Sequence, residues 1–372
     1  MTRWAWAEID AVAVEHNVRV LASTAASARP VQVWAVVKAD GYGHGSVAVA
    51  QAALAGGATG ICVALVQEGV RLREAGIDAP VLVLSEQPAD EVHSAVQHGL
   101  QLTVYSGRAL DSIADAGGVR HPVHLKVDTG MHRVGAAPHE VAALADAIAG
   151  SAAAELVGLS THLAVADEPD HPYTRQQLDL FDSVLDGLSA AGHRVPLVHA
   201  GNSAGAIVHP RARYSMVRPG IAIYGVSPGT GVDHLVQPLG LRPAMSLKAR
   251  VSHVQRRQAG DSLSYGLRHT FDADTTVATV PLGYADGVAR RSAAVGGEVL
   301  VGGRRRRVVG TVTMDQLMVD MGDDPVEVGD EVVLIGRQGD EWITAAEWAR
   351  LLGTIAYEVL CAVSARVPRV AV

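Results

Sequence analysis

Short aliphatic and β-branched runs alternate with longer Ala-rich stretches between residue 30 and about residue 225. The runs span residues 31–37, 61–66, 81–84, 100–104, 123–127, 156–160, 195–199 and 214–217. The intervening stretches, such as 46–55, 67–75 and 173–191, carry apolar residues at three- and four-residue spacing. Short apolar runs suit strands buried on both faces, whereas amphipathic stretches suit helices. The pattern therefore predicts alternating strands and helices.

Strands that alternate with helices pair in parallel, which places this part of the chain in the α/β class. Eight strand–helix units in about 200 residues match a closed (β/α)8 barrel of the TIM type. An open, doubly wound sheet is the alternative, but no G-x-G-x-x-G turn follows a strand. We therefore expect a barrel over residues 11–240.

The pattern changes after residue 240, where short apolar runs are separated by Gly-Asp, Gly-Gly and Asp-Asp-Pro turns. Such spacing is typical of antiparallel strands, here 245–254, 276–280, 298–301, 307–313 and 331–335. Two helices are expected near the end, at 345–352 and 355–363. Residues 241–372 are thus predicted to form a mainly β domain. The strand predicted at 4–9 belongs to segment 1–10, which could join either domain.

Charge and composition exclude several classes of protein. The 372 residues contain 31 Lys and Arg against 39 Asp and Glu, a net charge of −8, so no general attraction to nucleic acid or anionic membrane is expected. The run Arg304–Arg307 is interpreted as the solvated face of a hairpin. Two distant cysteines cannot build a disulfide framework or a zinc site. Acidic residues near the start argue against a signal peptide, and no apolar run approaches the ~20 residues of a membrane span. A cytoplasmic enzyme is expected.

Polar side chains follow several of the predicted strands. They are Lys38, Lys126, His162, Asn202, Ser203 and Arg218. The carboxyl ends of barrel strands carry the chemistry of such folds. Each residue also has a structural interpretation: a solvated strand end for the lysines, a hydrogen-bonded core histidine, and a helix N-cap for Asn202-Ser203.

Lys38 has the most suggestive surroundings, because an apolar run precedes it and Gly41, Gly43 and Gly45 follow. Glycines allow a ligand to approach the backbone closely, and desolvation makes a lysine amine a Schiff-base nucleophile.

The sequence gives less support to metal-dependent, phosphate-binding or serine-nucleophile chemistry. His121 and His124 lie three apart on a predicted strand and so face opposite ways, which is poor geometry for a metal. No H-E-x-x-H, P-loop or G-x-S-x-G motif is present.

Seven sequence blocks resemble the bacterial alanine racemases, pyridoxal 5'-phosphate enzymes built from a barrel and a β domain. They are AVVKADGYGHG at 35–45, KVDTGMHRVG at 126–135, THLA at 161–164, RPGIAIYG at 218–225, SYG at 264–266, PLGYADG at 281–287 and MDQ at 314–316. The blocks occur in the family's order and span nearly the whole chain.

The resemblance implies a role for each matching residue. Lys38 would hold the cofactor as a Schiff base and act with Tyr265 as the two bases that interconvert L- and D-alanine. Tyr42, Ser203, Tyr357 and the backbone of Gly220 and Ile221 would bind the phosphate. Arg218 would face the pyridine nitrogen, with His162 and Asn202 in support. Arg133 and the backbone of Met314 would bind the substrate carboxylate, and Lys126 would be carbamylated. Tyr284 and Asp315 would line the entrance, with Asp167 and Arg290 further out.

The resemblance further implies a homodimer whose sites are shared between subunits, and a role in supplying D-alanine for peptidoglycan.

Because an arginine does not lose its proton in a protein, Arg218 would leave the pyridine ring of the cofactor a weak electron sink and so favour racemisation over transamination. Three residues depart from the family pattern: His132, Thr311 and Thr313. Alternatives are a racemase of another amino acid or a decarboxylase of this fold, a cofactor-free Schiff-base aldolase, and a non-catalytic carrier of pyridoxal phosphate.

Overall fold

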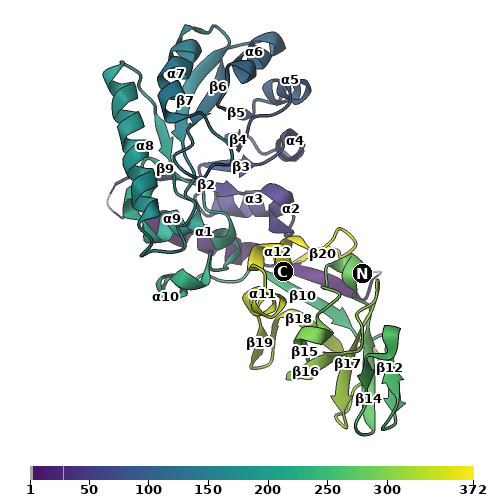
Figure 1. Ribbon diagram of the computed structural model, residues 1–372. Helices are drawn as coiled ribbons and strands as arrows, with labels where there is room; N and C mark the ends of the chain where they lie inside the picture. Colours follow the sequence, from purple (N-terminus) through teal and green to yellow (C-terminus); the bar gives the residue numbers. More distant parts are fainter. Residues whose placement is uncertain (1–2, 28) are drawn as a thin grey trace. The chain divides into compact units, whose positions relative to one another are not determined.

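The computed structural model describes residues 3–27 and 29–372 and divides into two compact units (Figure 1). The barrel unit comprises Val12–Gly41 and Ser46–Arg242. The C-terminal unit comprises the chain up to Ala11, Tyr42–Gly45 and Pro243–Val372. Among the described helices, none combines the length and the hydropathy needed to cross a bilayer.

Eight parallel strands form a nearly closed barrel, as the sequence predicts. They are β2 (Gln32–Val36), β3 (Gly60–Val63), β4 (Val81–Val83), β5 (Gln101–Val104), β6 (His121–Lys126), β7 (Ala154–Ser160), β8 (Leu197–His199) and β9 (Met216–Val217). The ladder runs β8-β7-β6-β5-β4-β3-β2-β9. The remaining gap is bridged by the Ser215 amide, which donates to the Val198 carbonyl at 3.1 Å. Each strand overlaps one predicted run, in the same order.

One helix precedes β2 and a helix follows each barrel strand. They are α1 (Ala11–Ala25), α3 (Ser46–Ala55), α4 (Val66–Glu74), α5 (Ala89–Gln97), α6 (Gly107–Ala116), α7 (Val141–Gly150), α8 (Tyr173–Ala190), α9 (Ser203–Val208) and α10 (Asp233–Val236). In α1, Val14, Val18 and Leu21 are buried at three- and four-residue spacing. The helices α3, α4 and α8 match the stretches that this periodicity predicts at 46–55, 67–75 and 173–191.

Large rings fill part of the barrel interior, and glycines make room for them. The Trp34 indole of β2 lies over Gly60 of β3, and the His124 imidazole of β6 lies over Gly158 of β7. A Cβ atom at either glycine would overlap the neighbouring ring. The two rings also meet edge to face, with centroids 5.9 Å apart.

The segment after β2 is a left-handed turn. Lys38–Tyr42 (α2) contains positive φ angles at Ala39 (53°), Asp40 (50°), Gly41 (63°) and Tyr42 (51°). For L-residues this conformation costs about 1–2 kcal/mol each. Three hydrogen bonds hold the turn: the Ala39 amide donates to Glu68 Oε1 (2.6 Å), the Ser46 amide to Asp40 Oδ1 (3.0 Å), and the Gly41 amide to the Val37 carbonyl (2.8 Å).

The C-terminal unit is built on a mixed sheet that is mainly antiparallel (Figure 1). Its order is β11 (His253–Arg257), β14 (Thr275–Val280), β17 (Leu317–Gly322), β16 (Arg304–Val309), β15 (Glu298–Val301), β18 (Glu331–Gln338), β10 (Met245–Arg250), β1 (Ala5–Ile9) and β20 (Arg369–Ala371). β19 (Glu341–Ile343) pairs with β18, and β12 (Ser262–Leu263) pairs with β13 (His269–Thr270). The helices α11 (Ala345–Leu352) and α12 (Ala356–Cys361) lie where two helices are predicted.

Some details of this unit differ from the sequence prediction. The predicted strand 245–254 is two strands, because the chain leaves β10 at Val251 and enters β11 at His253. The strand predicted at 307–313 begins at Arg304 and ends at Val309, so the arginine run is part of a strand. Arg305 forms ion pairs with Glu298, Glu341 and Glu347. The sequence did not decide which domain strand β1 joins. It pairs with β10 and β20 and so belongs to the C-terminal unit.

Candidate active site

The carboxyl ends of the barrel strands bring cationic side chains together. Lys38 follows β2, Lys126 ends β6 and Arg218 follows β9. Burial lowers the pKa of Lys126 to about 8, and the nearby charges of Arg218, Arg133 and Lys38 act in the same direction. Perturbed lysines at such a rim are typical of functional sites. The excess of positive charge favours an anionic ligand.

Several hydrogen bonds hold Arg218 in place. It is buried, and burial lowers its pKa to about 10, which leaves the guanidinium charged at neutral pH. Its Nη2 donates to the Thr161 carbonyl at 3.0 Å and to the Ala200 carbonyl at 3.4 Å, and its Nη1 bonds His199 Nδ1. His162 Nδ1 lies 3.5 Å from Nη2.

Ser203 and the backbone after Arg218 form a second polar group on this rim. The Ser203 hydroxyl accepts hydrogen bonds from the amides of Gly220 (2.9 Å) and Ala222 (3.3 Å), which flank Ile221. Asn202 Oδ1 accepts from the Gly205 amide at 2.9 Å and caps α9. The helix-cap interpretation of Asn202 is therefore confirmed.

The loop after Lys126 explains one departure from the family pattern. His132 has φ 54°, a conformation that glycine adopts most easily. Asp128 Oδ1 accepts from the amides of Gly130 (2.9 Å) and His132 (3.0 Å), so the carboxylate supports the turn that places Arg133. A larger residue is tolerated here because the His132 side chain is exposed.

Acidification is expected to destabilise the barrel through its buried histidines. Burial and the charge of Arg218 lower the pKa of His124 to about 3 and that of His199 well below its usual value. Below pH 6.5 the unfolded chain takes up protons that the native barrel excludes. The unfolding free energy should therefore fall between pH 6.5 and pH 5, by about 1 kcal/mol per pH unit for each such histidine.

Urea denaturation across this pH range measures the effect. His93 is an exposed histidine of α5, so His93→Gln provides the matched control variant. An unfolding free energy that stays constant from pH 6.5 to 5 would contradict the neutral state of the buried imidazoles.

The C-terminal unit brings two further candidate residues together. The rings of Tyr42 and Tyr357 lie with centroids 6.0 Å apart and planes tilted by 47°. Gly43 packs so closely on the Leu360 carbonyl that no Cβ fits there, and the Gly43 carbonyl accepts from Arg369 Nε at 2.8 Å. The segment Tyr42–Gly45 is thus fixed against α12, and the two phenols lie side by side.

Tyr265, Tyr284 and Met314 belong to connected loops. Thr311 Oγ1 donates to the Tyr265 carbonyl at 2.8 Å, and the Tyr284 amide donates to the Thr313 carbonyl at 3.0 Å. The Thr311 side chain and the Thr313 backbone therefore tie these loops together, so only the first of these two departures from the family pattern acts through its side chain. Tyr265, with 73% of its surface exposed, and Met314, with 51%, both face outward.

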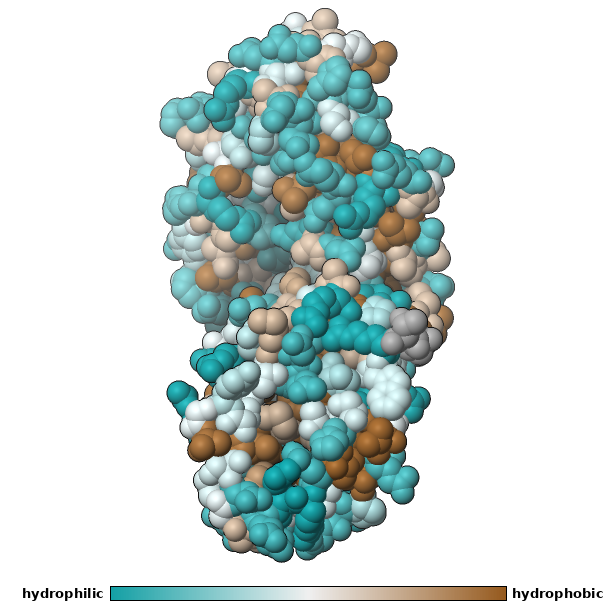
Figure 2. All heavy atoms as spheres, turned by 90° about the vertical axis from the view of Figure 1, so that its right-hand side faces the viewer, coloured by the Kyte–Doolittle hydropathy of each residue, from teal (hydrophilic) through white to brown (hydrophobic). Residues whose placement is uncertain are grey.

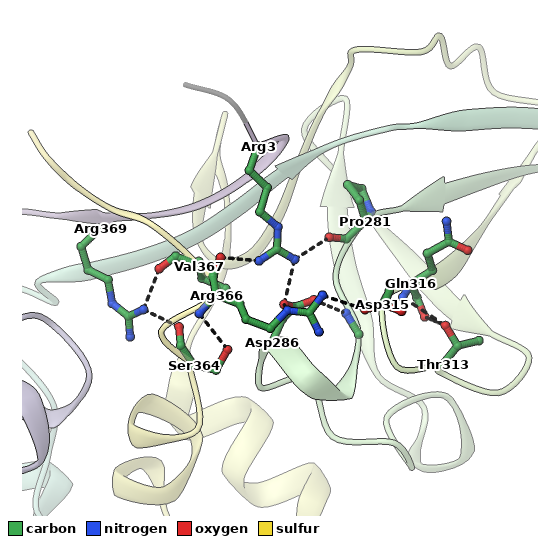
Figure 3. A network of polar contacts seen from close by, with 11 residues as sticks. Arg3, Pro281, Asp286, Thr313, Asp315, Gln316, Ser364, Arg366, Val367 and Arg369 are labelled. Atoms are coloured by element: carbon green, nitrogen blue, oxygen red, sulfur yellow. Dashed lines mark hydrogen bonds and ion pairs between the residues drawn. The ribbon is translucent and has the colours of Figure 1, made fainter.

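Asp315 is part of an ion-pair network (Figure 3). Arg366 Nη2 lies 2.7 Å from Asp315 Oδ1, and Arg366 Nε lies 3.3 Å from Oδ1 of the buried Asp286. Arg3 Nη2 lies 2.7 Å from the same Asp286 oxygen. No sequence signal pointed to Arg3 or Arg366, and the block at 281–287 contains Asp286 without indicating its partners, because these are far away in the chain.

The two outer candidates belong to different units. Asp167 is half-buried in the barrel unit, and the backbones of Gly229 and Gly231 pack directly against it. Arg290 is exposed in the C-terminal unit.

A barrel with a cationic rim, joined to a β unit that presents exposed phenols, defines a two-domain barrel enzyme. Family models agree with this class: residues 9–228 match the model described as "Alanine racemase, N-terminal domain", and residues 244–371 match "Alanine racemase, C-terminal domain".

Known proteins resemble the whole chain. The alanine racemase of Symbiobacterium thermophilum is 48% identical over 98% of this chain and 96% of its own length. The alanine racemase of Thermobifida fusca is 45% identical over 100% of this chain and 98% of its own length. The crystal structure of alanine racemase from Streptomyces lavendulae superposes with a TM-score of 0.93 at 37% identity, covering 100% of this chain and 98% of that one. The chain belongs to the alanine racemase family, whose members are isomerases.

Proposed function

We propose that the protein interconverts L- and D-alanine with pyridoxal 5'-phosphate, using Lys38 and Tyr265 as opposing acid–base groups, and supplies D-alanine for peptidoglycan. The cluster of Lys38, Lys126, Arg133 and Arg218 at the barrel rim carries this proposal, because its charge suits a phosphate and a carboxylate. A relative from Bacillus anthracis, 38% identical over 100% of this chain, was solved with L-Ala-P bound.

The residues present fit the cofactor. The Ser203 hydroxyl, the Ile221 amide and the adjacent phenols of Tyr42 and Tyr357 are neutral donors suited to a phosphate dianion, whereas the Gly220 amide would have to leave Ser203 Oγ to join them. Lys38 supplies the amine that would bind it covalently. When bound, pyridoxal phosphate withdraws electrons from the amino acid and so acidifies its Cα–H.

The chain's own residues determine how the acidified proton moves. Arg218 can only donate, so it would hydrogen-bond a ring nitrogen without transferring a proton to it. Arg133 and the Met314 amide would hold the substrate carboxylate. The Lys38 amine would exchange a proton on one face of Cα, and the Tyr265 hydroxyl on the other. Inversion needs both groups, because one base returns the proton to the face from which it came.

A panel of L-amino acids incubated with the purified protein and analysed by chiral chromatography tests this function. Rapid formation of D-alanine, with slower turnover of serine, is expected from an entrance lined by Tyr284. Turnover of a different amino acid instead would favour another racemase of this fold, and release of CO2 would favour a decarboxylase.

The site is proposed to be shared across a homodimer. Large apolar side chains are exposed on the C-terminal unit, as Figure 2 shows for one face of the molecule. Among them are Tyr265 (73% exposed), Leu267 (65%), Met314 (51%) and Tyr284 (43%). Hydrogen bonds connect the loops that carry Tyr265, Tyr284 and Met314, and contiguous exposed apolar patches mark interaction surfaces. A partner's barrel is the occupant that would place Tyr265 opposite Lys38.

Mixing two inactive variants is expected to restore activity if the sites are shared. Subunits of Lys38→Ala and Tyr265→Phe, unfolded together and refolded, should form hybrid dimers in which one site keeps both groups. The mixture should regain roughly a quarter of the wild-type activity, as expected for random twofold pairing. Each variant refolded alone is the control. If a mixture that is shown to contain hybrid dimers regains no racemase activity, the active site is not shared between subunits.

Lys126 is proposed to be carbamylated. With its pKa lowered to about 8, about a tenth of this amine is neutral at pH 7, far more than for an ordinary lysine. A neutral amine adds CO2, and the resulting anion would face the neighbouring Arg133 and Arg218. Carbon-13 NMR in labelled bicarbonate should show one carbamate resonance that is missing in Lys126→Met. Identical spectra for the two proteins would refute the modification.

A further inference from the structure

A line of side chains crosses the barrel interior from β5 to β9. Gln101 Oε1 lies 2.7 Å from His124 Nε2, and His124 Nδ1 lies 2.8 Å from His199 Nε2. His199 Nδ1 then bonds Nη1 of Arg218. His124, His199 and Arg218 are all buried, so the bonds between them are shielded from water.

The chemistry of the arginine end sets the direction of every bond in this line. A guanidinium only donates, so His199 Nδ1 must accept and the proton of that ring must sit on Nε2. That proton is donated to His124 Nδ1, which places the His124 proton on Nε2. Gln101 must therefore present its carbonyl oxygen. The opposite direction would set an N–H of His199 against an N–H of Arg218.

The surroundings keep both rings neutral and in place. Burial and the charge of Arg218 lower the pKa values of both imidazoles, and Lys126 adds to the effect at His199. The His124 ring packs edge to face against Trp34 and directly on the backbone of Gly158, and these contacts hold it in place. Bonds aligned in one direction inside a low-dielectric interior also polarise one another.

We propose that Gln101, His124 and His199 are positioning residues for Arg218, with the Gln101 amide as the terminal acceptor that fixes the protonated nitrogen of both rings. The relay holds Nη1 while the carbonyls of Thr161 and Ala200 hold Nη2, so the guanidinium is oriented from two sides. The effect on catalysis rests on the proposed function, in which Arg218 faces the cofactor ring. The positions of the protons on the two imidazole rings do not depend on the proposed function.

Neutron diffraction from crystals of the deuterated holoprotein tests the arrangement directly. We expect deuterium on Nε2 of His124 and His199, and none on Nδ1 of either ring. Deuterium on Nδ1 of either ring, or on both nitrogens, would overturn the proposal. This result is independent of whether the protein racemises alanine, so failure of the proposed function would be recognised separately.

Two variants test what the relay does for Arg218. Gln101→Leu removes the acceptor and should lower kcat about tenfold, leave KM for alanine nearly unchanged and alter the visible spectrum of bound pyridoxal phosphate. Gln97→Leu on exposed α5 is the matched control and should change neither. If Gln101→Leu keeps the kcat and the visible spectrum of the wild-type protein, the positioning role is wrong. If Gln101→Leu does not fold, Gln101→Glu and the neutron result decide.

Gln101→Glu distinguishes positioning from mere packing. The carboxylate still accepts from His124 Nε2, so kcat should approach the wild-type value at high pH. Its charge would stabilise a second proton on His124, which reverses the relay and sets His199 Nδ1–H against Arg218. The charged groups facing the relay, Arg218 and Lys126, oppose that proton but are unchanged by the substitution. A new loss of kcat on acidification is therefore expected, and a pH profile identical to wild type would overturn the proposal.

Discussion

Replacing Lys38 with alanine is expected to reduce alanine racemisation by at least roughly 10³-fold, since it removes both a covalent anchor and one of two proton-transfer groups. The amine emerges at the end of β2, on a backbone fixed by the left-handed turn, and lies among the cations of the rim. Circular dichroism that follows the conversion of each enantiomer of alanine measures the loss.

The chain offers an unusually clean control, because it contains three lysines, at positions 38, 126 and 248. Lys248 is ion-paired with Glu8 on the β sheet, and Lys248→Ala should retain activity. Borohydride treatment of the holoprotein followed by peptide mapping should place the cofactor on Lys38. Label on another lysine, or substantial racemisation by Lys38→Ala, would contradict the assignment.

Tyr265→Phe, which removes one hydroxyl, is expected to slow racemisation by about 10²–10⁴-fold, the usual contribution of a general acid–base group. The side chain is mostly exposed, so the substitution should leave the stability of the C-terminal unit nearly unchanged. Loss of activity without loss of folding would therefore report on chemistry.

Proton exchange in D2O makes this experiment decisive. With Tyr265→Phe, the Lys38 amine should still exchange the Cα proton of one enantiomer without inverting it, while the other enantiomer should exchange far more slowly. Tyr214→Phe, which removes a hydroxyl that donates to Asp182 Oδ1 at 2.6 Å, is the control and should behave as wild type. Equal exchange of both enantiomers by Tyr265→Phe would disprove the two-base mechanism.

The barrel was predictable because its signals are local. Each strand is a short apolar run such as Val81–Val83, each helix has a periodic apolar face, and parallel strands gather their following residues at one rim. The sequence alone therefore indicates that Lys38, Lys126, His162 and Arg218 are neighbours. Their roles remain proposals that the experiments above address.

Contacts between distant residues were not predictable in the same way. From the sequence, His124 is at most a poor metal ligand, and nothing in the chain pairs it with Gln101 or His199. Glu68 supports the Lys38 turn from the start of α4, where it also accepts from the Ala64 amide at 2.8 Å. Such pairings depend on register and side-chain direction, which hydrophobic periodicity does not specify.

The left-handed turn after Lys38 has a consequence for sequence variation. Ala39 and Asp40 are exposed, and burial alone would mark both as freely replaceable. Their backbone handedness imposes the opposite rule: β-branched residues should be excluded at both positions. Glycine or asparagine should be accepted at 39, and at 40 asparagine, which keeps an acceptor for the Ser46 amide. At this surface the range of tolerated residues is set by the chirality of the amino acids rather than by their contact with solvent.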